Sequence, residues 1–468
     1  MVAMPSHTMR NSMGSMTRLA SASCTVVVAS MMAILPTTAQ AAESEYDYSV
    51  LLKAGDLAPN GERLGGIFEV WSLNDRGQLA FDTDLTPSGA VGIYRYDRGH
   101  ILEIAKSGGA APGGGTFKFP ITMSMNGSGD VAFTGLLEPG GLLPRGAGAG
   151  VYAYSSRTGS LRAVLTPGVT RAPGGGVFRG VNVHEEINDN GVVSFPGLHP
   201  TPHGIPGNPS GLGSGIFRAD PDGRIAGLAV PGDPAPGGVL DFAYNATINE
   251  RGDVAFGGHI LGEECVDNPA DEKVIHCRTG VYTRRAGGPI TTVAHRGDPA
   301  PKGGIYRQAH TANIDRWGNV VFIGDLTPPP EEFGAYTGVY LYMAALGSVF
   351  PIVRPGDALP GGGHLKSVHF DVGSKYLSDW GQITIPAFLD TFTNGVRDEG
   401  IYVWSLGTLH LVARTGTVIP GIGKIASFAS ASGYGNVAQN NLGQLSFRAR
   451  LDDGRFIVLL ASPHGFVD

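Results

Sequence analysis

Several side chains in the central and C-terminal parts of the chain have the types that acid–base chemistry on a polar substrate requires. A lyase, for example, needs a base and a positively charged side chain that neutralises its substrate. The candidates are His184, Arg307, His310, His369 and Tyr376, with Lys375 as a further cation. Proteins that only bind carry the same residue types, so the position of these side chains in the fold decides what they do.

Standard catalytic and metal-binding patterns are absent from the sequence. It contains no G-x-S-x-G, no H-E-x-x-H and no phosphate-binding G-x-x-x-x-G-K-[ST] string, and HEEIN (184–188) lacks a second histidine. No acidic ladder of the D-x-D-x-D type supports a calcium site. We therefore expect neither a cofactor nor a bound metal.

Residues 1–41 have the pattern of a signal peptide. Arg10 and Arg18 precede a 12-residue apolar run (24–35), and Ala39-Gln40-Ala41 is a small-residue cleavage site. The run is too short to span a bilayer, although an uncleaved anchor is the alternative. We expect an exported protein, periplasmic or extracellular, with no membrane span in the mature chain.

The amino-acid composition and the net charge argue against one class of partner, nucleic acid. The net charge is −7, and no basic block concentrates the Lys and Arg residues, so nucleic acid is not an expected ligand. The chain has 72 glycines and 32 prolines among its 468 residues, yet apolar residues alternate throughout. This combination indicates strands joined by many turns, not disorder.

One eight-residue string recurs seven times along the chain. It opens with Asn, Asp or Ser, has Gly at its fourth place and continues into alternating apolar residues. An Asn or Asp side chain can accept a bond from the backbone two residues on, and Gly supplies a positive φ, so the string predicts a tight turn into a strand. The copies are NDRGQLAF (74–81), NGSGDVAF (126–133), NDNGVVSF (188–195), NERGDVAF (249–256), DRWGNVVF (315–322), SDWGQITI (378–385) and NNLGQLSF (440–447).

Other elements recur in step with this string. A short strand such as GVYLY (338–342) follows each hairpin, and a fourth strand precedes a Gly-rich loop such as PGDPAPGG (231–238). The loops repeat an Asp that we interpret as a cap for nearby backbone N–H groups, namely Asp56, Asp233, Asp298 and Asp357.

Seven units of about 60 residues predict an all-β, seven-bladed β-propeller of four-stranded blades over residues 46–461. YDYSVLLK (46–53) looks like a fourth strand, and the chain ends after a third-type strand at 455–460. We therefore predict that the N-terminal strand completes the last blade and closes the ring, leaving 462–468 as a short tail. A β-helix and tandem sandwiches are the alternatives.

The strings and the Gly-Asp loops together resemble the bacterial choice-of-anchor tandem repeat NxxGxxAF-containing proteins over nearly all of residues 50–460. The resemblance implies a secreted or surface-displayed repeat protein. Many members carry a C-terminal sorting segment, from which the ending ASPHGFVD departs.

In a propeller the strand that leads into each Asn turn lines the central channel. Polar side chains two and four residues before the turn then form a hydrated wall or bind a polar ligand, and the rim loops 196–215, 257–277, 323–337 and 386–399 carry the variable residues. The expected function is a binding or scaffold module for a glycan or a surface protein. The alternative is a carbohydrate-active enzyme, a polysaccharide lyase or hydrolase.

Cys265 and Cys277 are the only cysteines after the signal peptide, and they flank a short polar loop. Export permits a disulfide, so we predict that these two residues are bonded.

Overall fold

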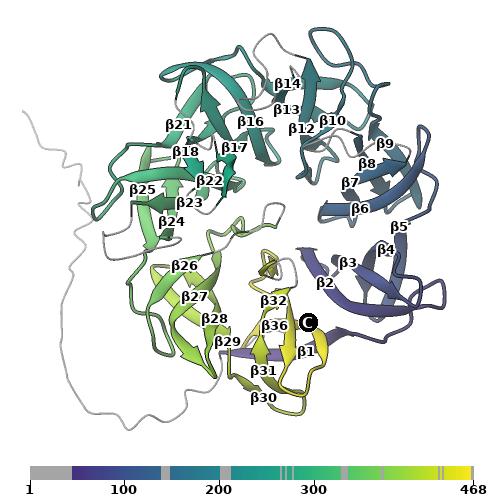
Figure 1. The fold of residues 1–468 in the computed structure, drawn as a ribbon, viewed down its shortest axis with the longest axis vertical. Coiled ribbons are helices and arrows are strands. Elements are labelled where there is room, and N and C mark those ends of the chain that lie inside the picture. Colours follow the sequence, from purple (N-terminus) through teal and green to yellow (C-terminus); the bar gives the residue numbers. More distant parts are fainter. Residues whose placement is uncertain are drawn as a thin grey trace, which may run out of the picture. The chain divides into compact units, whose positions relative to one another are not determined.

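The computed structural model describes residues 45–138, 148–200, 212–263, 266–268, 271–276, 279–327, 336–368, 370, 374–430, 433–434 and 437–464. All regular structure within these ranges is β-strand, arranged as seven antiparallel sheets and two short hairpins. The seven sheets follow one another around a ring (Figure 1), so the predicted seven-bladed β-propeller is confirmed.

The first three blades follow the predicted order, with the inner strand first. Blade 1 contains β2 (Arg63–Leu73), β3 (Leu79–Thr86), β4 (Val91–Asp97) and β5 (His100–Lys106), and blade 2 contains β6 (Thr116–Met125), β7 (Val131–Glu138), β8 (Ala149–Ser155) and β9 (Ser160–Leu165). Blade 3 has a broken inner strand and contains β10 (Gly180–Val181), β11 (Glu186–Ile187), β12 (Val193–Pro200), β13 (Leu212–Ala219) and β14 (Ile225–Ala229).

Blades 4 to 6 repeat this order. Blade 4 contains β15 (Pro234–Ala235), β16 (Gly238–Ile248), β17 (Val254–Ile260), β20 (Gly280–Arg284) and β21 (Ile290–His295), with a hairpin of β18 (Val266–Asn268) and β19 (Asp271–His276) between β17 and β20. Blade 5 contains β22 (Tyr306–Ile314), β23 (Val320–Leu326), β24 (Thr337–Met343) and β25 (Ser348–Val353). Blade 6 contains β26 (Leu365–Val368), β27 (Ile383–Thr393), β28 (Val396–Ser405) and β29 (Thr408–Arg414).

Blade 7 combines the two ends of the described chain. It contains β30 (Val418–Ile419), β31 (Gly423–Ser427), β34 (Val437–Gln439), β35 (Leu445–Leu451), β36 (Phe456–Pro463) and β1 (Tyr46–Lys53), next to a hairpin of β32 (Ala429–Ser430) and β33 (Gly433–Tyr434). β1 pairs antiparallel with β36, from Tyr46 opposite Pro463 to Lys53 opposite Ile457 (Figure 1, purple against yellow). The predicted closure by the N-terminal strand is therefore confirmed, and β36 extends two residues into the segment expected to be tail.

The hydrophobic core lies between neighbouring blades. Trp71 and Ile93 of blade 1 pack with Phe133 and Tyr152 of blade 2, and the other interfaces are similar. The second strand of a blade is covered on both faces, so all seven residues of β17 are buried. Packing of this kind buries most of the apolar area and is the main stabilising term.

The turns form as the sequence predicted. Asn249 Oδ1 accepts hydrogen bonds of 3.0 Å from the backbone N–H groups of Arg251 and Asp253, and Gly252 has a φ of +80°. The first side chain of all seven strings accepts the same bond from the residue two places on. The repeated loop Asp is confirmed as a local cap, since each accepts from the backbone N–H three residues earlier.

Candidate functional site

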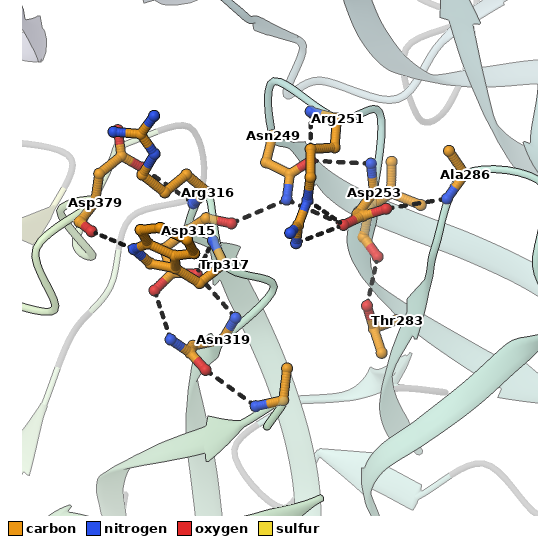
Figure 2. A network of polar contacts seen from close by, with 12 residues as sticks. Asn249, Arg251, Asp253, Thr283, Ala286, Asp315, Arg316, Trp317, Asn319 and Asp379 are labelled. Atoms are coloured by element: carbon orange, nitrogen blue, oxygen red, sulfur yellow. Dashed lines mark hydrogen bonds and ion pairs between the residues drawn. The ribbon is translucent and has the colours of Figure 1, made fainter. Parts of the chain in front are cut away.

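The turn asparagines also bond one blade to the next. Asn249 Nδ2 donates a hydrogen bond of 2.9 Å to the backbone carbonyl of Asp315 in blade 5 (Figure 2). Asp315 and Ser378 occupy the same place in blades 5 and 6 and have no amide to donate. The same bond links the other asparagines to the following blade, from Asn74 to Asn126, from Asn126 to Asn188, from Asn188 to Asn249 and from Asn440 to Asn74.

A second set of bonds runs beside the first. The second residue of the turn string donates its backbone N–H to the side chain at the same place in the next blade, as from Arg316 to Asp379 Oδ1 at 3.0 Å. Equivalent bonds join Gly127 to Asp189, Asp189 to Glu250, Asp379 to Asn441 and Asn441 to Asp75. The carboxylates at the turn end of the channel are thus held in fixed positions.

Polar side chains two residues before the turn bond across the blades as well. Ser124 Oγ accepts from the backbone N–H of Ile187 at 2.8 Å, and Glu186 Oε2 accepts from that of Ile248 at 2.8 Å. The predicted polar channel wall is therefore largely occupied by structural bonds. A ligand can bond only to the channel side chains that these bonds between blades leave without a partner.

A distorted backbone four residues before the turn changes which side chains face the channel. Thr122, His184, Asn245 and Thr311 all have positive φ, between +38° and +98°, and the register shifts at this point in blades 2, 4 and 5. A non-glycine residue rarely adopts such a φ. Because the strict alternation is lost, consecutive residues His184, Glu185 and Glu186 all line one small cavity of about 20 Å³.

Two buried polar atoms at this small cavity have no hydrogen-bond partner among the residues that the structure describes. Ser374 in blade 6 is 1% exposed and its Oγ makes no bond, while Glu185 in blade 3 is 2% exposed and its Oε1 makes none. The other carboxyl oxygen of Glu185 accepts from the hydroxyls of Thr122 and Thr134 in blade 2. Burial raises the pKa of Glu185 to about 8, against the effect of these hydroxyls.

A larger cavity of about 90 Å³ lies between the Asn turns and touches all seven blades. Glu186 lines both cavities, and burial raises its pKa to about 7 although the charge of Lys375 opposes the shift. The lining carboxyl groups are Asp75, Glu186, Asp189, Glu250 and Asp379, against the single ammonium of Lys375. The turn end of the channel is therefore strongly acidic.

Of the predicted catalytic candidates that the structure describes, only His184 and Lys375 line the two channel cavities. His184 lines the small cavity. Arg307 is bound to Asp325, with 2.6 Å between Nη2 and Oδ2, and His310 Nδ1 lies 3.0 Å from Thr311 Oγ1. Tyr376 is buried at 1% exposure and stacks on Phe370 with 4.1 Å between ring centres.

Other predicted features are described only in part. His369, Cys265 and Cys277 lie outside the described residues, as do residues 201–211 and 328–335 of the rim loops. The prediction of a ligand at the rim therefore stays a prediction. Sequence reasoning missed Glu185, because an alternating strand would have turned it away from the channel.

In the part of the chain that the structure describes, no group of three or more His, Cys, Asp or Glu side chains is placed to hold a metal ion. No described segment forms a helix long and apolar enough to cross a membrane.

These features define a β-propeller with a polar, acidic channel. The chain belongs to a family of unknown function, DUF7453, whose model matches residues 25–457. No curated protein matches the sequence. Solved structures with similar folds include an oligogalacturonate lyase in complex with manganese (12% identity, 90% of this chain and 99% of that chain covered, TM-score 0.49) and the β-propeller domain of the Trilobed protease from Pyrococcus furiosus (10%, 86% and 96%, 0.45). A third is the GH74 enzyme of Niastella koreensis (12%, 89% and 53%, 0.43).

Proposed function

We propose that this protein is an exported binding module that takes the polar end of a ligand into the channel between blades 3 and 6. The observation that carries the proposal is the pair of unpartnered buried atoms, Glu185 Oε1 and Ser374 Oγ, at one cavity. A buried polar atom without a hydrogen bond is destabilising by about 1–3 kcal/mol. A ligand that bonds to both atoms removes this penalty, which favours binding.

The charge of the channel narrows the class of ligand. Five carboxyl groups and one ammonium line the turn end, so a polyanion is repelled there and a neutral or amino-bearing group is favoured. The cavities of about 90 Å³ and 20 Å³ admit only the tip of a ligand. A terminal residue of a neutral or amino glycan fits these limits, and so does a Lys side chain of a surface protein.

Calorimetry of the protein without residues 1–41 against neutral, amino and acidic oligosaccharides tests this proposal. We expect saturable binding of a neutral or amino glycan, and at least about tenfold weaker binding for Ser374→Ala and Glu185→Gln. Ser446→Ala is the matched control, because this buried hydroxyl bonds to the Leu459 carbonyl inside blade 7. Equal affinity in all variants, or binding of acidic glycans alone, would exclude the channel as the site.

A carbohydrate-active enzyme is the second candidate, and one observation favours it. The pKa values of Glu185 and Glu186, about 8 and about 7, allow a carboxyl group to be a proton donor near neutral pH. The same glycan panel, assayed for new reducing ends and unsaturated products, separates the two functions. An enzyme should release products that Glu186→Gln abolishes while binding remains, and a binding module should release none.

A further inference from the structure

The outer part of the turn face carries grooves between neighbouring blades. A groove of about 420 Å³ lies between blades 2 and 3, and another of about 280 Å³ lies between blades 4 and 5. Both are bounded by the hairpin after the third strand of one blade and by the Asn turn of the next. They are separate from the unpartnered atoms of the channel.

The size of each groove depends on one residue of the third strand, the residue that directly follows the aromatic residue recurring in each blade. In blade 1 this residue is Arg95, whose Nη1 donates a hydrogen bond of 2.7 Å to the carbonyl of Gly129 in the next blade. In blade 3 it is Arg218, which lies against Gly252 of the next blade. Blades 2 and 4 have Ala153 and Thr283 at this place, and these short side chains leave the two grooves open.

The groove between blades 2 and 3 contains an arginine that no described group neutralises. Arg162 on β9 lies opposite Ala153 in the strand register, so both side chains project from the same face of the sheet. Arg162 is half-buried, and burial lowers the pKa of its guanidinium. Among the described residues it makes no hydrogen bond and no ion pair within 4.0 Å, and Arg157 lines the same groove.

The two carboxylates of this groove are already engaged elsewhere. Asp130 Oδ1 accepts from the backbone N–H and the hydroxyl of Ser156, and its Oδ2 accepts from Asn126. Asp189 Oδ1 accepts from the backbone N–H of Gly127 at 2.6 Å. These bonds hold both carboxylates in place, so they do not pair with the guanidinium groups.

We propose that the groove between blades 2 and 3 is a second binding site, which takes an oxyanion (a carboxylate, sulfate or phosphate group of a ligand) on Arg162 and Arg157. Guanidinium groups bind such anions through two parallel hydrogen bonds. The hydroxyls of Thr158 and Ser160 line the same space and bond to each other at 2.6 Å, which leaves one of the two to donate to the ligand. The site lies apart from Glu185 and Ser374 but shares Asp189 with the turn end of the channel, and its two guanidinium groups select an anion.

The test is a titration of the protein without residues 1–41 with sulfate, phosphate and glucuronate at constant ionic strength, followed by the chemical shifts of the arginine side chains. We expect saturable binding of at least one of the three anions, and the one that binds most tightly identifies the source of the oxyanion. Arg162→Ala should weaken this binding by about tenfold or more. Arg285→Ala should not, since Arg285 occupies the equivalent hairpin of blade 4 without a second arginine beside it in its groove.

Ala153→Leu provides an independent test. This substitution copies Leu341 of blade 5, so an uncharged side chain should fill part of the groove opposite Arg162. We expect a folded protein that binds the anion more weakly. Binding that is unchanged in both Arg162→Ala and Ala153→Leu, or the absence of saturable binding for all three anions, would overturn the proposal without affecting the channel.

Discussion

Asn440 Nδ2 in the last blade donates a hydrogen bond of 3.2 Å to the backbone carbonyl of Asn74 in the first blade. This bond extends the belt of turn asparagines, which Asp315 and Ser378 interrupt in blades 5 and 6, across the point where the two ends of the propeller meet. The pairing of β1 with β36 closes the ring near the outer edge of blade 7, whereas Asn440 closes it near the axis. The repeated Asn therefore has two functions, a cap for its own turn and a link to the next blade.

The link can be removed without removing the cap. In Asn440→Asp the Oδ1 acceptor stays, the Nδ2 donor to the Asn74 carbonyl and to Gln444 Oε1 is lost, and the new carboxylate is buried. We therefore expect the free energy of unfolding to fall by about 1–3 kcal/mol, measured as a lower urea midpoint. The same change in the exposed β27–β28 turn, Asn394→Asp, is the control and should have little effect. If Asn440→Asp and Asn394→Asp have the same free energy of unfolding, the bonds from the turn asparagines to the next blade do not stabilise the protein.

Closure by the N-terminal strand predicts the effect of a truncation. Deletion of residues 45–53 leaves the edge of β36 unpaired and uncovers part of the core that Leu52 shares with blades 1 and 7. We expect a broader thermal transition at a lower temperature and a tendency to aggregate, because an open strand edge pairs with other molecules. A deletion of residues 465–468 is the control. An unchanged melting curve for the N-terminal deletion would contradict a closed ring.

The repeat strings predict the blades correctly because each of their local features is compatible with only one backbone conformation. Gly at the fourth place is needed for the positive φ of the turn, as at Gly252, and the alternating residues that follow can only form a strand. A glycine recurs two residues before the third-strand tyrosine, and the sequence alone gives no reason for it. The structure supplies the reason, because a Cβ on Gly400 would lie 2.6 Å from the ring of Tyr402.

The candidate site could be predicted less well. Alternation assigned His184 and Glu186 to the channel, which is correct, but the backbone distortion at His184 also brings in Glu185. No residue in the sequence signals this distortion, since Thr122, His184, Asn245 and Thr311 share no common type. The groove beside Ala153 is recognised only when the blades are compared in three dimensions. The sequence alone therefore did not reveal that Arg162 is a cation with no ion-pair partner among the described residues.

The cysteine pair remains a sequence prediction that one experiment decides. Cys265 and Cys277 lie outside the described residues, while their sequence neighbours Val266 and His276 are opposite each other in the β18–β19 register. We expect peptide mapping of the exported protein without reductant to yield one linked pair. In the chain-entropy model such a short loop contributes roughly 3 kcal/mol, so reduction should lower the melting temperature. Two free thiols in the exported protein would disprove the bond.

The buried carboxyl of Glu185 predicts how stability depends on pH. Its pKa is about 8 in the folded protein against an ordinary value of 4.5, so between these values the folded protein binds more protons than the unfolded chain. Stability must then fall as the pH rises from about 4.5 to about 8.

Glu185→Gln removes this titration and keeps the shape of the side chain. We expect the variant and the wild type to have similar melting temperatures at pH 5, and the variant to be more stable at pH 9 by up to a few kcal/mol. A weaker dependence of stability on pH should remain in Glu185→Gln, because burial also raises the pKa of Glu186 to about 7. Glu138→Gln, a change at an exposed carboxyl on β7, is the control and should follow the wild-type profile. If Glu185→Gln also follows that profile, Glu185 does not retain its proton in the folded protein, and the cavity between blades 3 and 6 is more open to water than its burial indicates.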